Sequence, residues 1–310
     1  MKPVRDIELR PGMTVSDLIS SFSSSGGFTA SEVWKAAELW KEMVESGDTI
    51  FLSFPACIVA TGTRGVLAEV LRRKLVDVVI TTCGTLDHDL ARLWAEYYCG
   101  TFDADDAELA ERDIHRIGSV FVPAENYGKV IERKLGPILR DLRYPIGTRD
   151  LVWEIGKRIS DHPGAEKSLT YWAWKNRIPV FIPGITDGSV GSQLWMLWEE
   201  GKKNLIDVFA DEHDLSDVIF SSKSTGAVIV GGGISKHHTI WWNQFRGGLD
   251  RAVYLTTAGE YDGSLSGARP REAVSWKKLK PGAGSVCVFG DATLTLPLIV
   301  SALVDSVGRR

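Results

Sequence analysis

The segment FLSFPACIVATGTRGVLAEVLRRKLVDVVITTCG, residues 51–84, suggests a strand, a glycine-containing turn, a helix and a second strand. Its first ten residues, 51–60, are a nearly continuous apolar run, which is typical of a strand buried on both faces. Residues 76–82 repeat this apolar and β-branched character after the helix. A strand–helix–strand unit predicts parallel strands joined by a right-handed crossover.

The carboxyl ends of these strands are the expected ligand side, because open parallel sheets bind ligands there. Gly62, Thr82, Cys83 and Gly84 fall at those ends. ATGTRG does not match the GxGxxG pattern, so by itself it gives only a weak dinucleotide signal.

Four later segments extend the sheet outward from this unit. They are IPVFIPG (178–184), AVIV (227–230), AVYLTTA (252–258) and SVCVFGDA (285–292). We therefore predict an α/β fold: a Rossmann-like, parallel-rich sheet with helices on both faces and a short N-terminal helical extension. Residues 1–48 are expected to form an N-terminal arm and helix, and residues 49–310 a single larger domain.

Within the N-terminal part, residues 1 to about 30 are polar and include SSFSSSGGF, so a flexible arm is expected. A helix is predicted from Thr29, with Thr29 or Ser31 as its cap, because apolar residues follow at helical spacing.

Composition narrows the function classes. The net charge of -4 does not indicate the basic surface that is typical of nucleic-acid-binding proteins. No apolar run approaches the roughly 20 residues of a spanning helix, and the N-terminus lacks a signal-peptide core, so a cytoplasmic protein is expected. The four cysteines have no metal-type spacing, and three lie in apolar or aromatic surroundings, which favours buried free thiols.

The loop EYDGSLSGARPREAVSWKK, residues 260–278, is too long and polar to be a simple connector between two strands. It ends with a lysine near a large aromatic side chain. A lysine is nucleophilic only without its proton, and an apolar wall lowers its pKa. Trp276 is a candidate wall for Lys278. The alternative is a solvated basic turn, because Lys280 adds another lysine nearby.

Three further motifs have both a structural and a functional interpretation. Asp87, His88 and Asp89 are expected to open a helix, where carboxylates are often partners of the helix dipole. Asp187 in ITDGSVG suits a ribose hydroxyl or an amine, or a simple Asp-Gly turn. GGGISKHH (231–238) permits close approach of a dinucleotide or a tight helix–strand contact. Adjacent histidines without a third ligand make a poor zinc site, so no metal is expected.

The loop at 260–278 resembles the active-site loop of the deoxyhypusine synthase family, whose pattern is DGS–SGARP–EAVSW–x–K. Other stretches resemble the same family in the same order, from about Phe51 to Val304. They are VDVVITT (76–82), IHRIGSVFVPAENY (114–127), ITDGSVG (185–191) and GGGISKHH. The resemblance implies that residues 49–310 form an NAD-binding catalytic domain.

The resemblance also implies a reaction. NAD oxidises a polyamine, usually spermidine, and its aminobutyl group passes through an enzyme-lysine imine to a lysine of the hypusine-bearing translation factor. Lys278 matches the covalent lysine, and His237 matches the histidine near the bond that breaks. Substrate matches are Glu272 and Trp276. Cofactor matches are Thr82, Cys83, Gly84, Asp187, Thr257, Ala258, Asp262, Asp291 and Ala292.

This sequence departs from the family's pattern at positions that grip the polyamine. Ser192 and Leu265 replace two aspartates, and Asp87 and His88 stand where better-known members carry two acidic residues. An ammonium left without its partner typically costs about 2–5 kcal/mol. Either the donor amine differs, or acids such as Asp211, Glu212 or Asp214 replace the missing ones.

Three functions are therefore compatible with the sequence. The first is aminobutyl transfer to a protein lysine, and the second is the same chemistry with a small amine acceptor, as in a homospermidine synthase. The third is a catalytically degenerate regulatory family member. The resemblance implies a homotetramer with its sites at subunit interfaces.

Overall fold

The structure of the protein, a computed structural model, describes residues 1–307. The chain forms two compact units. Unit 1 comprises Met1–Phe54, Arg73–Ile80 and the described residues from Leu215 onward, and unit 2 comprises Pro55–Arg72 and Thr81–Asp214. Residues 308–310 of the expected catalytic domain lie outside the described residues.

Unit 1 is built on parallel strands. These are β1 (Thr49–Ser53), β2 (Val78–Ile80), β7 (Thr225–Val230), β8 (Leu249–Thr256) and β9 (Leu279–Phe289). They lie in the order β2-β1-β7-β8-β9, and every neighbouring pair is parallel. All six residues of β7 are buried, as expected for a strand covered on both faces. The predicted parallel-rich α/β fold is confirmed.

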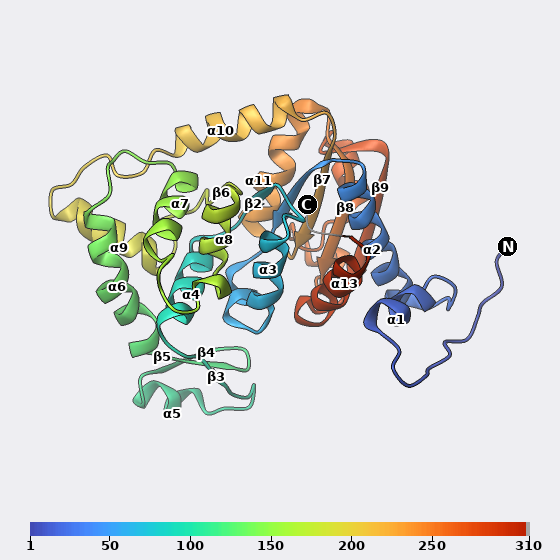
Figure 1. Cartoon of the computed structure of the whole chain (residues 1–310), viewed down its shortest axis with the longest axis horizontal. Helices are drawn as coiled ribbons and strands as arrows, with labels where there is room; N and C mark the ends of the chain where they lie inside the picture. Colours follow the sequence, from blue (N-terminus) through green and yellow to red (C-terminus); the bar gives the residue numbers. More distant parts are fainter. Residues whose placement is uncertain (308–310) are drawn as a thin grey trace. The chain divides into compact units, whose positions relative to one another are not determined.

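The helices of unit 1 come from both ends of the chain. They are α1 (Val15–Ser21), α2 (Phe28–Glu45), α11 (Gly233–Asn243), α12 (Pro270–Ser275) and α13 (Ala292–Ser306), with short 3-10 turns η4 (Gln244–Arg246) and η5 (Glu260–Asp262). α11 packs against β1, β2 and β7, whereas α2 and α13 pack against β8. α1 and α2 also pack against α13, so the first and last helices lie side by side (Figure 1).

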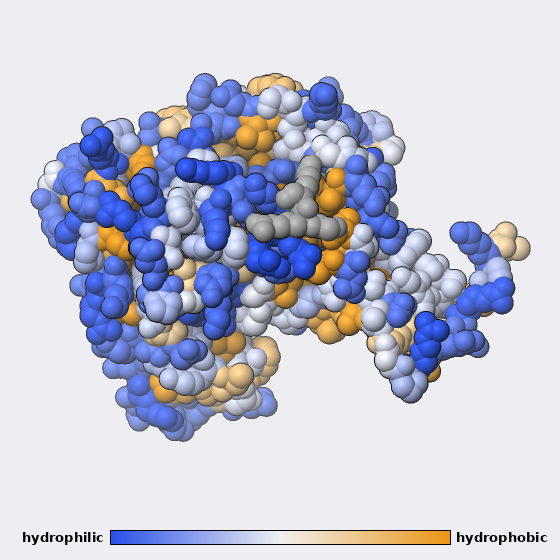
Figure 2. Space-filling model, in the orientation of Figure 1, coloured by the Kyte–Doolittle hydropathy of each residue, from blue (hydrophilic) through white to orange (hydrophobic). Residues whose placement is uncertain are grey.

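The N-terminal arm is more ordered than its composition predicts. Thr14 and Asp17 form a capping box at the start of α1, with each side chain bonded to the other's backbone N–H. Ile19 is buried, so a flexible arm was the wrong prediction for α1. The predicted caps of the next helix, Thr29 and Ser31, were also wrong, because α2 begins at Phe28 after Gly27. Residues 1–10 are exposed and mostly hydrophilic (Figure 2).

The strand predicted over residues 51–60 was only partly correct. β1 ends at Ser53, and Ala56–Ala60 form the 3-10 helix η1 after Pro55. Proline has no N–H to donate to a strand ladder. Ile58 and Val59 are buried, so the continuous apolar run reflects burial rather than strand structure.

Unit 2 is mainly helical. Besides η1 it contains α3 (Thr63–Arg72), α4 (Cys83–Trp94), α5 (Asp106–Glu111), α6 (Gly128–Arg140), α7 (Thr148–Arg158), α8 (Leu169–Asn176) and α9 (Ser189–Glu199), with 3-10 turns η2 (Ala124–Asn126) and η3 (Ala165–Lys167). Its strands are β3 (Tyr98–Cys99), β4 (Ile114–Ile117), β5 (Val120–Pro123) and β6 (Val180–Phe181), of which β3, β5 and β4 form an antiparallel sheet. α10 (Val208–Ser221) contains the division between the units at residue 214.

A buried ion pair joins three helical segments of unit 2. Arg64 of α3 donates to Asp89 of α4 at 2.8 Å. Asp89 is fully buried and also accepts bonds from the Ser168 hydroxyl and from the backbone and hydroxyl of Thr170. The Arg64 guanidinium and these donors hold the pKa of Asp89 below its usual value despite burial, which raises it.

Two further expectations need correction. α4 begins at Cys83, so Asp87, His88 and Asp89 lie inside the helix rather than opening it. All four cysteines are free, but only Cys83 is buried; Cys57 and Cys99 are exposed and Cys287 is half-buried. In residues 1–307, no helix is long and apolar enough to cross a membrane.

Candidate functional site

A cavity of about 310 Å³ in unit 1 gathers the residues of the 260–278 loop against α11 and β8. It is lined by Lys236, His237, Ile240, Trp241, Tyr254, Leu265, Ala268, Arg269, Glu272, Ala273, Trp276 and Lys278. Five of the predicted site residues therefore lie around one cavity: Lys278, His237, Glu272, Trp276 and Leu265.

Lys278 is held between α12 and β9. Its backbone N–H donates to Ala273 at 2.9 Å, and its carbonyl accepts from Leu249 of β8 at 3.1 Å. The residue is 8% exposed, and its Nζ lies 5.1 Å from the ring centroid of Trp276. The solvated basic turn proposed as the alternative does not apply to Lys278, because this side chain is buried.

A second indole ring, which the sequence analysis did not identify, also faces this lysine. Trp241 of α11 lies 5.9 Å from the Lys278 Nζ. Trp276 is itself 64% exposed, so it cannot form the apolar wall alone. Trp241 is four residues after His237, and this helical spacing is the signal that would have placed both side chains on one face.

His237 lies beside the lysine. It stacks on Trp241 with ring centroids 5.7 Å apart and planes 19° apart. Burial, and then the nearby charge of Lys278, lower the pKa of His237 below its ordinary value. A neutral imidazole near an amine is suited to accept and return a proton. The adjacent His238 is more deeply buried, and its pKa is lowered to about 4 by burial and by His237.

Within the part of the chain that the structure describes, Glu272 is the only carboxylate that lines this cavity. It belongs to the first turn of α12, and its side chain is exposed. Glu260, another acid of the loop, is paired with Arg269 at 3.2 Å and Arg271 at 3.0 Å. Leu265 occupies an apolar position in the lining. The cavity therefore has one anionic position, three cationic side chains (Lys236, Arg269 and Lys278) and an otherwise mostly apolar lining.

The glycines that follow β7 bring the loop close to the sheet. A Cβ on Gly232 would lie 2.2 Å from the Ser266 hydroxyl and 2.6 Å from its backbone. Gly232 thus makes a close contact with the loop, and not the helix–strand contact proposed as the structural alternative for GGGISKHH. Gly233, with φ +66°, has no atom within 4 Å of a built Cβ, so space remains there.

Five cofactor candidates lie at the carboxyl ends of β8 and β9 in unit 1. They are Thr257, Ala258, Asp262, Asp291 and Ala292. Thr257, Asp262 and Asp291 are exposed, and Gly259 and Gly263 border open space. Asp291 also caps α13 through Thr293. Exposed carboxylates at this edge of a parallel sheet suit the hydroxyls of a nucleotide ribose.

The other four cofactor candidates belong to unit 2. Thr82 precedes α4, Cys83 and Gly84 begin it, and Asp187 is exposed before α9. The Cys83 thiol is buried, and burial, with the charge of Asp87, raises its pKa to about 12. A Cβ on Gly188 would lie 2.8 Å from the Cys83 sulfur, so this segment packs tightly on the thiol.

Asp87 is completely buried in unit 2, and its carboxylate accepts from the Cys83 thiol at 4.0 Å and from three N–H or O–H donors. The N–H groups of Ser189 and Val190, at the start of α9, and the Tyr127 hydroxyl each donate to it at 2.8 Å. Burial raises the pKa of Asp87, while these bonds oppose the rise. The carboxylate therefore caps another helix, α9, rather than its own.

His88 and Ser192 lie close to this capping group in unit 2. The His88 ring pairs with the Tyr97 hydroxyl at 2.9 Å and stacks on Tyr127, and burial lowers its pKa to about 4. Ser192 is exposed in α9, and its hydroxyl donates to the Gly188 carbonyl at 3.1 Å.

Comparison with known proteins decides the family. The sequence profile described as "DS: Deoxyhypusine synthase" matches residues 17–303. A Picrophilus torridus protein named "Probable deoxyhypusine synthase" is 56% identical over 303 residues, covering 97% of this chain and 96% of that protein. A Thermoplasma acidophilum protein of the same name is 54% identical over the same shares.

The chain belongs to the deoxyhypusine synthase family. Its relatives carry the name of a transferase, so this is a transferase family. A crystal structure of an Entamoeba histolytica protein assigned as a deoxyhypusine synthase shares the fold, with a TM-score of 0.69 and 22% identity over 99% of both chains.

Two of the acids considered as replacements in this family member are engaged elsewhere in unit 2. Asp211 accepts bonds from the N–H groups of Thr148 and Arg149 at the start of α7. Asp214 pairs with Arg149 at 2.8 Å. Neither carboxylate is therefore free to compensate for Ser192 or Leu265.

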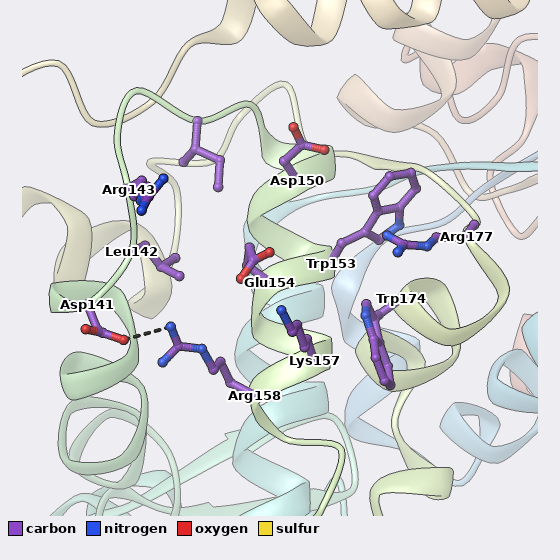
Figure 3. Close-up of a pocket in the computed structure, with 11 residues that line it drawn as sticks. Asp141, Leu142, Arg143, Asp150, Trp153, Glu154, Lys157, Arg158, Trp174 and Arg177 are labelled. Carbon is purple, nitrogen blue, oxygen red and sulfur yellow. Dashed lines mark ion pairs between the residues drawn. The ribbon is translucent and has the colours of Figure 1, made fainter.

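A second cavity, of about 730 Å³, lies in unit 2 between α7 and neighbouring segments (Figure 3). Trp153, Trp174 and Arg177 lie on one side of it, and Asp141 pairs with Arg158 on the other. Cations and carboxylates are mixed around it. None of the predicted site residues of this deoxyhypusine synthase family member lines it.

Proposed function

We propose that this chain transfers the aminobutyl group of a polyamine, spermidine or a related amine, to one lysine of the hypusine-bearing translation factor. The observation that carries the proposal is the placement of Lys278: its Nζ lies within 6 Å of two indole rings in a cavity that also contains His237 and Glu272.

Each residue has a distinct task in this scheme. Lys278, as the neutral amine, attacks the oxidised donor and holds the aminobutyl fragment as an imine, which releases the remaining amine. His237 moves protons to and from the reacting nitrogens, because its lowered pKa keeps the imidazole neutral near pH 7. Glu272 holds an ammonium end of the donor, and the indoles exclude water from the imine.

NAD supplies the redox chemistry when bound, taking a hydride from the donor amine and returning it to the final imine. We assign its ribose contacts to Asp262 and Asp291, with Thr257, Ala258 and Ala292 alongside. The exposed carboxylates and open glycine positions at the ends of β8 and β9 support this assignment. In unit 2, we expect backbone contacts from Thr82, Cys83 and Gly84 and a side-chain contact from Asp187.

Binding of the donor amine is expected to depend less on ion pairs than in proteins with the family pattern, because Leu265 replaces an acid in the cavity. In unit 2, we propose that Asp87 acts on substrate binding through the start of α9, which it caps, with His88 and Ser192 close to this helix terminus. The protein is expected to be a homotetramer. It is expected to act in the cytoplasm, because its protein substrate is made there.

Two alternatives remain distinguishable. Transfer to a small amine such as putrescine would use the same Lys278 and His237. A catalytically degenerate regulatory subunit would keep the fold without forming an imine. The buried placement of Lys278 supports the two enzymatic functions over the regulatory one.

The test is borohydride trapping of labelled spermidine in the presence of NAD. Label is expected on Lys278, and the Lys278→Ala variant should lose it while NAD binding stays measurable. Lys277→Ala is the matched control, because Lys277 is adjacent but exposed. Offering the translation factor and putrescine separately then identifies the acceptor. If no lysine of the native protein is labelled, the proposed chemistry is wrong.

A further inference from the structure

Two lysines line the unit 1 cavity, and their surroundings differ. Lys236 is 1% exposed, and its Nζ donates to the Leu265 carbonyl at 2.7 Å and the Ala268 carbonyl at 2.8 Å. The same Nζ lies 4.1 Å from the ring centroid of Tyr254. Lys278 makes no side-chain hydrogen bond within residues 1–307. The Lys236 ammonium is thus fully occupied by protein groups, whereas the Lys278 nitrogen remains available for reaction.

The two carbonyls belong to the loop that lines the cavity and leads into α12. Leu265 lines the cavity directly, and Ala268 immediately precedes Arg269, the N-cap of α12. Glu272 lies in the first turn of that helix. Lys236 itself belongs to α11 and precedes His237. One side chain therefore joins the helix that carries the proton carrier to the loop that positions the cavity's only carboxylate.

A positive charge on a side chain buried this deeply destabilises the fold unless neighbouring groups compensate for the lost water. Burial lowers the pKa of Lys236 to about 8, and Arg269 adds to the fall, while Cys287 and Glu272 oppose it. No carboxylate forms an ion pair with Lys236 among the described residues. Hydrogen bonds from a charged donor are stronger than those from a neutral one, so the two carbonyl bonds, with the Tyr254 ring, offset the desolvation of the ammonium.

We propose that Lys236 is a positioning residue for the transferase: it fastens the 264–269 loop to α11 and so sets the places of Leu265 and Glu272 relative to His237. Lys236 does not receive the aminobutyl group. The kinetic consequences of this inference rest on the proposed function. The attachment of the loop to α11 by Lys236 is independent of it.

The experiment compares Lys236→Met with Lys236→Arg, using Lys277→Met as the exposed control. Methionine keeps an apolar stem and removes every donor, whereas arginine keeps the charge and can donate to both carbonyls. Lys236→Met is expected to raise the KM for spermidine about tenfold or more, the equivalent of about 1.4 kcal/mol. Its kcat should fall less, Lys236→Arg should be intermediate, and borohydride labelling should remain on Lys278.

A second readout does not need activity. Backbone amides of residues 264–272 should exchange with deuterium faster in Lys236→Met than in the native protein, while amides of β7 stay protected. Lys236→Arg provides the same comparison should Lys236→Met not fold. Unchanged KM together with unchanged exchange would overturn the proposal, as would labelling of Lys236. Faster exchange without any imine on Lys278 would leave the loop fastening standing and refute the proposed function alone.

Discussion

The Nζ of Lys278 lies 5.9 Å from the indole centroid of Trp241, and His237 stacks on that same indole. The candidate nucleophile and the candidate proton carrier therefore share one aromatic neighbour. Trp276 contributes the nearer ring but is largely exposed. Trp241 is thus expected to influence both the access of water to Lys278 and the orientation of His237.

Trp241→Ala should reduce borohydride labelling of Lys278 about tenfold, because water would reach the amine and its imine once the indole face is removed, and a tenfold change corresponds to about 1.4 kcal/mol. Trp241→Phe should retain most of the labelling. Trp198→Ala is the matched control, since Trp198 also pairs with a lysine, Lys203, but in unit 2 and away from the cavity's lining. Equal labelling in Trp241→Ala and the native protein would contradict the role of this ring.

Leu265→Asp should shift donor preference toward more highly charged polyamines. The variant adds a second carboxylate to a cavity in which that of Glu272 is otherwise the only one. The ratio of kcat/KM for spermidine to that for a diamine should rise about tenfold, the range expected for a new ion pair in a partly buried site. Leu9→Asp, at an exposed position of the arm, is the control. A constant ratio would show that Leu265 does not contact the donor.

Acidification should destabilise unit 2 through His88. Its folded pKa is lowered to about 4 from the ordinary 6.5, so the unfolded chain binds a proton where the folded chain does not. The contribution of His88 to the free energy of unfolding is therefore fully present above pH 6.5. It falls as the pH drops toward 4, by up to about 3 kcal/mol. Urea unfolding at several pH values should show a shallower slope for His88→Gln than for the native protein.

His115→Gln serves as the control for this measurement, because His115 is exposed in the same unit. It should preserve the native pH slope between 6.5 and 4. The lowered pKa of His238 adds a similar component in unit 1, which His88→Gln retains. Identical slopes for His88→Gln and the native protein would exclude His88 as a source of the effect.

Asp89→Asn should be among the most destabilising single changes in unit 2. It leaves the buried Arg64 without its counter-ion and turns one acceptor into a donor facing Ser168 and Thr170. Breaking a buried pair in this way costs about 3–5 kcal/mol, which thermal or urea unfolding detects. Asp106→Asn, which removes an exposed partner of Arg116, should change stability little. A small effect of Asp89→Asn would mean that unit 2 can relax around Arg64.

Much of the fold could be predicted locally. β7 and β8 are short apolar runs between turn residues, and such runs are typical of buried parallel strands wherever they occur. The prediction failed at 56–60, because a buried 3-10 turn and a buried strand have the same apolar composition. It also failed for α1, whose packing on α13 depends on residues almost the whole chain away.

The site divides in the same way. The sequence by itself determined the family and predicted the set Lys278, His237, Glu272 and Trp276, because these residues lie in short motifs of fixed spacing. Only the tertiary structure decided that Trp241 faces Lys278 and that Lys236 is bound to the carbonyls of a distant loop. It also decided that Asp87 caps α9. Motifs record neighbours along the chain, whereas hydrogen bonds, ring contacts and burial depend on neighbours in space.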